Sequence, residues 1–298
     1  MKFGIQRIGR LMNPNYHKPV MVEEVLAGLS IQAGKQYIDA TLGGGGHAME
    51  IVKRGGILLG IDADADAIEY ARDRLKSDSC TLVQGNFRNI ETIAKENGFE
   101  EVSGIVMDLG VSSYQLDTAD KGFSYRFLEA PLDSRFDRTK GESAAECVNH
   151  SSEEELYEVF TKFGEEERAG PIAHALIRAR SVKEITTVGD IVRVVKLVAG
   201  DNKQTTGVLS RIFQALRMQV NDEVIALREG LAGAERILAP GGMFAVISFH
   251  SLEDRVVKLF MQGDGWHQIT KKPTIATLSE WRANSRSRSA KLRIAQKI

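Results

Sequence analysis

Short apolar stretches alternate with amphipathic ones over about the first 100 residues, and this alternation constrains the fold more than any other feature. Four apolar stretches predict strands, at residues 37–40, 56–61, 80–87 and 103–110. Three stretches between them predict helices, at residues 48–53, 65–75 and 90–96. Strand–helix alternation of this kind indicates right-handed βαβ units. We therefore expect an α/β fold whose central sheet is parallel.

The alternation stops after the fourth predicted strand. Four stretches of helical pattern then follow, at residues 153–164, 169–182, 188–200 and 208–220. A second set of sheet-domain elements resumes later, with helices predicted at 223–238 and 252–263 and strands at 241–249, 266–272 and 290–298. We therefore expect an inserted helical domain of residues 113–214 within a discontinuous domain of residues 1–112 and 215–298. An insert at the carboxyl edge of an open sheet borders its ligand crevice.

Four consecutive glycines, starting at Gly43, follow the first predicted strand in YIDATLGGGGHAMEIV. Ordering them is costly in backbone entropy, so we infer that a ligand approaches this backbone closely. The segment from Gly43 to Ala48 satisfies the dinucleotide pattern G-x-G-x-x-[G/A], and a strand, a Gly-rich turn and a helix predict a nucleotide site. Asp62 ends the second strand, where a carboxylate accepts hydrogen bonds from a ribose diol. The alternatives are a tight turn without ligand and a helix-capping role for Asp62.

A nucleotide site of this kind leaves two main cofactors, a nicotinamide dinucleotide or S-adenosylmethionine. A dinucleotide needs a second mononucleotide half, whereas here a helical insert interrupts the sheet and no second Gly-rich turn follows a strand. The fourth strand instead ends in MDLGVSSYQLD, which places Asp108 beside the glycine turn. An acid there suits a reaction centre close to a sulfonium, so a methyltransferase fits better than a dehydrogenase.

The charge of the chain is nearly balanced, with 39 basic and 40 acidic residues, so any nucleic-acid surface has to be a local patch. The clearest one is WRANSRSRSAKLRIAQK near the end of the chain, which contains six basic residues and no acid. The two cysteines fit no disulfide or metal pattern, and no run of eighteen apolar residues is present. The N-terminal MKFGIQRIGR also lacks an apolar signal region, and we expect a soluble cytoplasmic protein without membrane partners or bound metal.

Seven motifs occur in order along nearly the whole chain. They are HKPVMVEEV, YIDATLGGGGHAMEI, DLGVSSYQLD with KGFSYR, PLDSRFD, FQALRMQVNDE, GGMFAVISFHSLEDRVVK and NSRSRSAKLR. Together they closely resemble the bacterial MraW/RsmH family of ribosomal RNA cytosine-N4 methyltransferases. The resemblance implies a Rossmann-like methyltransferase sheet with a helical insert after its fourth strand. It also implies methyl transfer from S-adenosylmethionine to the exocyclic amine of a decoding-region cytosine in 16S rRNA of the small ribosomal subunit.

The resemblance further implies a set of cofactor contacts, which by position are Gly45, Gly46, His47, Asp62, Phe87, Asp108 and Gln115. We expect Gly45 and Gly46 to admit the methionine moiety, while the first two glycines of the run form the turn. Asp62 would hold the ribose. Phe87 would stack on the adenine, with core packing as the alternative. His47 begins a helix, and we expect its backbone amide to matter more than its imidazole.

Catalysis and RNA binding need further residues. The amine of cytosine is a weak nucleophile, so a group that accepts its N–H bonds would help, and Asp108 is the first candidate. Asn221 and His250 are further candidates, although His250 could instead hold the loop after the fifth strand. Candidate RNA contacts are Arg135, Arg217, Arg286 and Arg288. For Arg135, in PLDSRFD, a salt-bridged loop is the alternative.

Two departures limit what can be carried over. The D/N/S-P-P-Y/F turn common among amino-methyltransferases is replaced by Asp108-Leu109-Gly110-Val111, as in the resembling family generally. The usual His-Pro-Ala-Thr-Arg-Thr before FQALR is replaced by residues 207–212, GVLSRI, of which only Arg211 matches. Two other functions are alternatives: a nicotinamide-dependent dehydrogenase and a non-catalytic RNA-binding ribosome-assembly factor. The sequence leaves the oligomeric state open.

Overall fold

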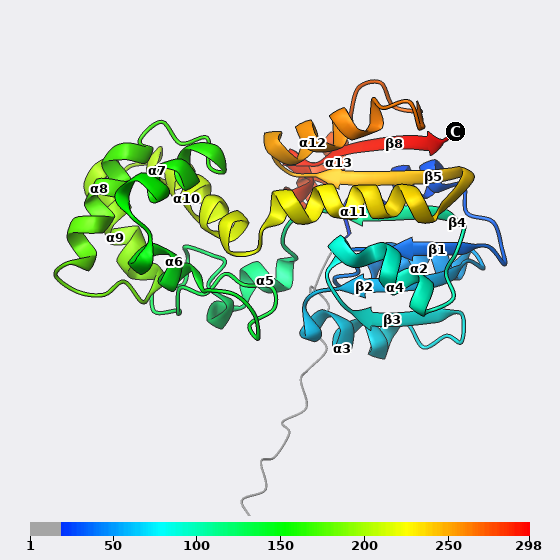
Figure 1. Ribbon diagram of the computed structural model, residues 1–298, viewed down its shortest axis with the longest axis horizontal. Helices are drawn as coiled ribbons and strands as arrows, with labels where there is room; N and C mark the ends of the chain where they lie inside the picture. Colours follow the sequence, from blue (N-terminus) through cyan, green and yellow to red (C-terminus); the bar gives the residue numbers. More distant parts are fainter. Residues whose placement is uncertain (1–18) are drawn as a thin grey trace, which may run out of the picture.

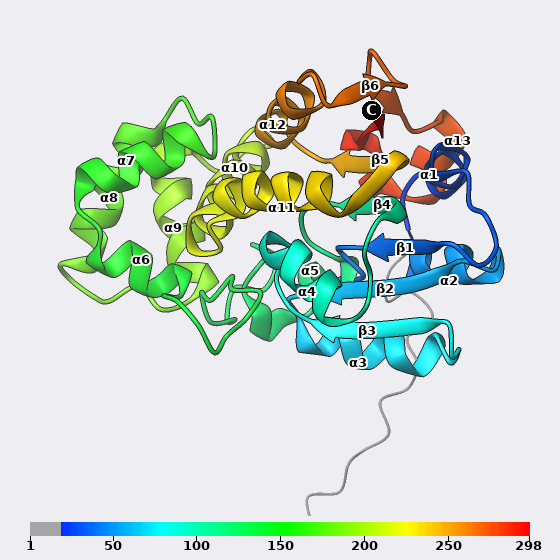
Figure 2. The same ribbon diagram turned by 45° about the vertical axis from the view of Figure 1, so that its right-hand side comes forward.

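The computed structural model describes residues 19–298, and within them the protein consists of a sheet-containing lobe and a helical lobe (Figure 1). The segment MKFGIQRIGR, for which we expect no signal region, lies outside the described residues. The first two residues of HKPVMVEEV lie outside them as well. A view turned by 45° shows the same two lobes, with α11 running from the helical lobe along the sheet (Figure 2). No helix among residues 19–298 is long and apolar enough to cross a lipid bilayer.

The central sheet has the strand order β3-β2-β1-β4-β5-β8-β6, and β7 pairs with β8. Its strands are β1 (Gln36–Asp39), β2 (Ile57–Asp62), β3 (Cys80–Gln84), β4 (Val102–Asp108), β5 (Leu238–Ser248), β6 (Trp266–Gln268), β7 (Thr274–Ile275) and β8 (Lys291–Lys297). The pairs among β1 to β5 are parallel, whereas β8 is antiparallel to β5, β6 and β7. The predicted α/β fold with a mostly parallel sheet is therefore confirmed.

Helices cover both faces of this sheet. They are α1 (Val22–Leu29), α2 (Gly46–Lys53), α3 (Ala65–Arg74), α4 (Ile90–Glu96), α11 (Glu223–Ile237), α12 (Ser251–Met261) and α13 (Leu278–Ala283). Side chains alternate between two cores, because successive strand residues point to opposite faces. In β1, Tyr37 joins the core of α1, α2 and α3, and Ile38 joins the core of α4, α11 and α12. The adjacent β4 repeats this pattern with Val106 and Met107.

The helical lobe lies between β4 and β5 in the chain and has a hydrophobic core of its own. Its helices are α6 (Ala144–His150), α7 (Glu153–Lys162), α8 (Ala169–Arg180), α9 (Val188–Ala199) and α10 (Thr205–Val220). Capping boxes begin three of them, at Ser143, Ser152 and Thr187, where side chain and backbone satisfy each other's hydrogen bonds. Helix α10 continues across the predicted boundary at residue 215, and the division at residues 112 and 215 stays a prediction.

Three short elements connect the lobes to the cavity described below. Helix α5 (Ser113–Asp117) and the 3-10 helix η2 (Ala119–Lys121) directly follow β4, and the 3-10 helix η3 (Ser285–Ser289) precedes β8. A fourth, η1 (Phe87–Asn89), follows β3 and contacts α11. These elements bring polar side chains from distant parts of the chain to the carboxyl edge of the sheet.

Candidate active site

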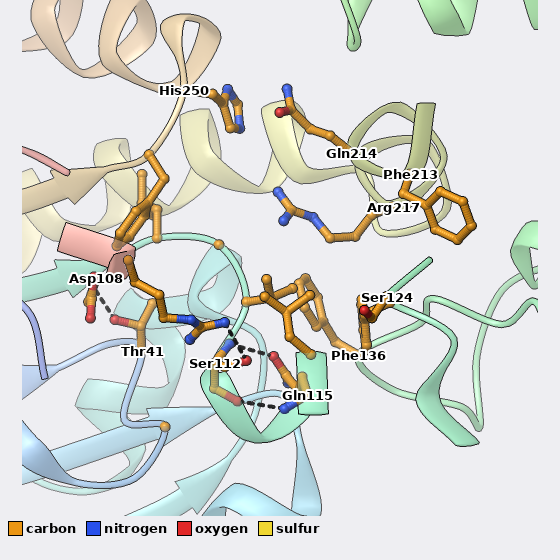
Figure 3. Close-up of a pocket in the computed structure, with 18 of the residues that line it drawn as sticks. Thr41, Asp108, Ser112, Gln115, Ser124, Phe136, Phe213, Gln214, Arg217 and His250 are labelled. Carbon is orange, nitrogen blue, oxygen red and sulfur yellow. Dashed lines mark hydrogen bonds between the residues drawn. The ribbon is translucent and has the colours of Figure 1, made fainter. Parts of the chain in front are cut away.

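A cavity of about 530 Å³ lies where the carboxyl ends of the central strands meet the helical lobe (Figure 3). Residues from the ends of β1, β2, β4 and β5 line one side, among them Thr41, Gly43, Asp62, Asp108 and His250. The other side is formed by residues of α10 and of the segment after β4, among them Phe213, Gln214, Arg217, Ser124 and Phe136. Its size suits a small-molecule ligand.

The glycine turn is tied to the carboxylate that ends β2. The backbone N–H of Gly43 donates to Oδ2 of Asp62 at 2.7 Å, and the N–H of Asp64 donates to Oδ1 at 2.9 Å. Burial raises the pKa of Asp62 to about 6, although these two amide donors act in the opposite direction. Gly43 adopts a positive φ of 49°, and both Gly43 and Asp62 line the cavity.

The division of roles expected within the glycine run differs from what the structure shows. Gly43 lines the cavity, whereas Gly45, Gly46 and His47 are absent from its lining. Position 45 favours glycine because its φ at the start of α2 is 73°. Position 46 favours glycine because a Cβ there would lie only 2.6 Å from the ring of Pro19. The imidazole of His47 is buried, with Nε2 2.9 Å from the carbonyl oxygen of Val20. Their roles as cofactor contacts stay predictions.

Asp108 lies at the end of β4 in the cavity wall, beside the residues that follow β1. Its backbone N–H donates to the hydroxyl of Thr41 at 2.6 Å. Asp39, which lies two residues before Thr41 and is fully buried, accepts a hydrogen bond from the N–H of Thr41 at 3.2 Å. Burial raises the pKa of Asp39 to about 7, and the nearby carboxylates of Asp108 and Asp62 add to this effect.

Gln115 and Phe87 both line the cavity, but each also has a structural contact. The amide of Gln115 completes the capping box of α5 with Ser112 and donates from Nε2 to Asp64 at 2.9 Å. The ring of Phe87 packs closely against Gly230 of α11, where a Cβ would lie only 2.6 Å from it. Phe87 therefore lies in the cavity wall and also packs against α11, and its stacking on an adenine stays a prediction.

His250 and Arg217 belong to a chain of polar and charged side chains at the boundary between the lobes. His250 caps α12 and places Nε2 3.0 Å from Oε1 of Glu253. Arg217 forms a two-pronged ion pair with Glu223, at 2.6 and 2.9 Å. Burial would raise the pKa of Glu253, but His250 and Arg217 outweigh it and hold this pKa low. His250 thus holds the loop after β5 and also faces the cavity.

Asn221 and Arg135 also lie outside the lining of this cavity. The amide of Asn221 accepts from the N–H of Phe136 and donates to the carbonyls of Ser134 and Arg217, so both of its ends are engaged. Arg135 makes a two-pronged ion pair with Asp133, at 2.8 and 3.0 Å. The catalytic assignment of Asn221 and the RNA contact of Arg135 stay predictions, and this geometry favours structural roles for both.

Arg286 and Arg288 come from η3, which borders the cavity through Arg286 and Ser289. Arg286 donates to the carbonyl of Ser112 at 3.1 Å, which ties the C-terminal part of the chain to the segment after β4. Burial lowers the pKa of Arg286. Arg288 is exposed, so its guanidinium is accessible to a polyanion.

Sequence reasoning missed several residues of the cavity wall, among them Thr41, Ser124, Phe136, Phe213 and Gln214. Thr41 lies two residues after the strand-ending Asp39, and this position alone could have indicated it. The described residues hold no group of three or more His, Cys, Asp or Glu side chains placed to bind a metal ion. The cavity fits an uncharged ribose and a planar ring, because Asp62 supplies a carboxylate and Phe87 an aromatic wall.

Comparison with known proteins relates the chain to one family. The model of the MraW methylase family matches residues 15–298. The ribosomal RNA small subunit methyltransferase H of Symbiobacterium thermophilum is 42% identical over an alignment that covers 95% of this chain and 97% of the relative. The protein of the same name from Carboxydothermus hydrogenoformans is 40% identical, with coverages of 95% and 98%. The one from Deinococcus deserti is 44% identical, with coverages of 95% and 93%.

Proposed function

Because the chain belongs to the MraW methylase family, we propose that it transfers a methyl group from S-adenosylmethionine to 16S rRNA of the small ribosomal subunit. The names of its relatives support a ribosomal RNA methyltransferase of this subunit. The finer assignment, to the N4 amine of a decoding-region cytosine, rests on the sequence resemblance. We propose a cytoplasmic location because the substrate is a ribosomal RNA.

One arrangement supports this proposal most directly. Asp108, Asp62 and the amide-bearing turn at Gly43 face a single cavity, which α10 bounds from the opposite side. A nucleoside cofactor would be held by the Asp62 carboxylate through its ribose and by Phe87 through its base. S-adenosylmethionine supplies an electrophilic methyl group on a sulfonium when it is bound. Gly43, which lines the cavity without a side chain, would leave the backbone there open to its amino-acid end.

The chain's own contribution to the reaction is mainly positioning. Holding two reactants in line can supply roughly 7–11 kcal/mol of the barrier reduction. The exocyclic nitrogen of cytosine is a weak nucleophile because its lone pair is delocalised into the ring. A carboxylate at Asp108 would accept an N–H bond from this amine, localise the lone pair and offset the positive charge that develops on the nitrogen. Thr41 fixes the backbone of Asp108 for this task.

The RNA side of the cavity is formed by the helical lobe. A base cannot be reached inside a duplex, so the target cytosine has to be unstacked and inserted between the lobes. Gln214, Arg217 and His250 point toward one another across this space and offer polar groups to a base edge (Figure 3). Arg288 lies next to cavity-lining residues of η3 and would contact phosphate.

A thermal-shift titration separates the proposal from its alternatives. Stabilisation by S-adenosylhomocysteine, with no effect of NAD⁺ or NADH, is the expected result. The reverse pattern would indicate a dehydrogenase. A non-catalytic assembly factor would bind unmodified small subunits without transferring label from methyl-labelled cofactor to their RNA. The comparisons support neither alternative.

A further inference from the structure

The segment of residues 112–126, here called the wall segment, follows β4 and forms one side of the cavity. Seven of its residues line the cavity: Ser112, Gln115, Leu116, Phe123, Ser124, Tyr125 and Arg126. Two attachments to the sheet lobe come from its first half, the Ser112 carbonyl to Arg286 and the Gln115 amide to Asp64. The position of this wall relative to the strand ends therefore depends on a small number of polar contacts.

Lys121 makes a third attachment, and it is the most buried ion pair of the wall segment. Its Nζ lies 2.5 Å from Oδ2 of Asp64 and 3.1 Å from Oδ2 of Asp66. The same ammonium lies 5.3 Å from the ring centre of Tyr114, within range of a cation–π contact. Lys121 is 9% exposed and Asp64 is 4% exposed, so solvent screens their attraction little.

Asp64 connects this ion pair to the cavity. Its backbone N–H donates to Oδ1 of Asp62, and its Oδ1 caps α3 by accepting from the N–H of Asp66. Its Oδ2 accepts from both Lys121 and Gln115. One carboxylate thus joins the turn that holds Asp62 to the wall segment across the cavity.

We propose that Lys121 is a positioning residue that couples the wall segment to the Asp62 carboxylate and thereby sets the affinity for the cofactor. This inference rests on the proposed function, because it takes the cavity at Asp62 to be the S-adenosylmethionine site. Without the Lys121 ammonium, the buried carboxylate of Asp64 loses its positively charged partner. Of the two side chains of the wall segment that donate to it, only Gln115 then remains. Such an unpaired charge draws in water or moves toward solvent, and both changes displace the turn that carries Asp62.

Three variants test the coupling. Lys121→Met removes the charge at similar length, and Lys121→Arg restores it. Lys95→Met is the matched control, because Lys95 forms an exposed ion pair with Glu91 on α4, away from the cavity. For each variant we would measure the Kd of S-adenosylhomocysteine by calorimetry, the KM values for cofactor and for RNA, kcat, and the unfolding temperature.

We expect Lys121→Met to raise the Kd and the cofactor KM by about tenfold or more, since small displacements of positioning groups are costly. The KM for RNA should change much less, and Lys121→Arg should recover most of the affinity. Lys95→Met should match the wild type. If Lys121→Met does not fold, the double variant Lys121→Met with Asp64→Asn serves instead. It leaves no buried unpaired charge and keeps a residue that caps helices well, and a rise in Kd is still expected, because the attachment of Lys121 to residue 64 is lost.

A lowered unfolding temperature with unchanged Kd and cofactor KM in the Met variant would overturn the inference, because Lys121 would then be purely structural. Failure of the proposed function gives a different result. In that case the wild-type protein itself would neither bind S-adenosylhomocysteine nor transfer a methyl group, whatever residue occupies position 121.

Discussion

The backbone N–H of Asp108 donates a 2.6 Å hydrogen bond to the hydroxyl of Thr41, and this bond joins the carboxyl ends of β4 and β1 inside the cavity. The two residues are 67 positions apart in the chain. The backbone N–H of Thr41 in turn donates a hydrogen bond to the carboxylate of Asp39 at the end of β1. The carboxylate proposed to act on the substrate therefore sits on a backbone held by its neighbouring strand.

Replacing Thr41 by Val keeps the shape of the side chain but removes the acceptor for the Asp108 N–H. An unsatisfied buried donor costs about 1–3 kcal/mol, and because this donor is part-buried the free energy of unfolding should fall by at most that amount. We also expect kcat to fall, because Asp108 loses its fixed position. Thr41→Ser keeps the hydroxyl and is the control. Equal kcat values for the Val variant and the wild type would argue against this role.

Asp108→Asn tests the carboxylate itself. The amide has the same size but a weaker acceptor and no charge, so we expect kcat to fall by about 100-fold. Binding of S-adenosylhomocysteine should change only slightly. Single-turnover measurements with saturating RNA separate the chemical step from product release. A wild-type rate under these conditions would exclude Asp108 as the acceptor of the amine proton.

The buried Asp39 makes stability depend on pH. Burial raises its pKa from 3.8 to about 7, so the folded protein holds this proton more tightly than the unfolded chain. Between about pH 4 and pH 7, rising pH therefore removes stability, by up to ~1.4 kcal/mol per unit of pKa difference. Asp39→Asn does not ionise and can still accept from the Thr41 N–H. The unfolding temperature of this variant relative to the wild type should rise from pH 5 to pH 8, and a constant difference would contradict the assignment.

Arg217→Met removes the partner of the largely buried Glu223. Breaking such a pair leaves an uncompensated charge and costs about 3–5 kcal/mol. We expect a large loss of stability in chemical denaturation. Arg217→Met combined with Glu223→Leu should recover much of it, because neither charge remains. If the single variant were as stable as the wild type, the ion pair with Glu223 would not contribute to stability. A role of Arg217 in binding RNA would then be the remaining explanation for its position in the cavity wall.

Arg288→Ala should weaken RNA binding without loss of stability, because this side chain is exposed. If it contacts one phosphate, the slope of log K against log salt should decrease by about 1. Arg282→Ala, at another exposed position of the same basic cluster, tests whether the effect is local to η3. An unchanged affinity and salt slope for Arg288→Ala would place the RNA elsewhere.

The sequence predicted the parallel part of the sheet well, because buried parallel strands appear as continuous apolar runs between helices. The runs that contain Ile38, Leu59 and Ile105 are of this kind, and each lies in its expected strand. Short elements were missed. Strand β7 has two residues, and α5 and α13 are short and polar, so none carries enough periodicity to be recognised.

The site was predictable only in part, because several of its features depend on contacts between distant residues. Asp62 and Asp108 could be placed in the cavity, since both end parallel strands that meet at one edge. The pairing of Lys121 with Asp64 joins positions 57 apart, and no local pattern indicates it. The packing of Gly46 against Pro19 is similarly invisible in the sequence, so the sequence could not show that Gly46 lies against another segment of the protein itself.

Identifying the methylated atom tests the central claim most directly. The protein would be incubated with methyl-labelled S-adenosylmethionine and small ribosomal subunits from cells lacking the modification, and the RNA would then be digested and analysed by mass spectrometry. The account predicts label on the N4 amine of one cytosine of 16S rRNA, strongly reduced with the Asp108→Asn variant. Label on a ring carbon or a ribose hydroxyl, or no label in the RNA, would contradict it.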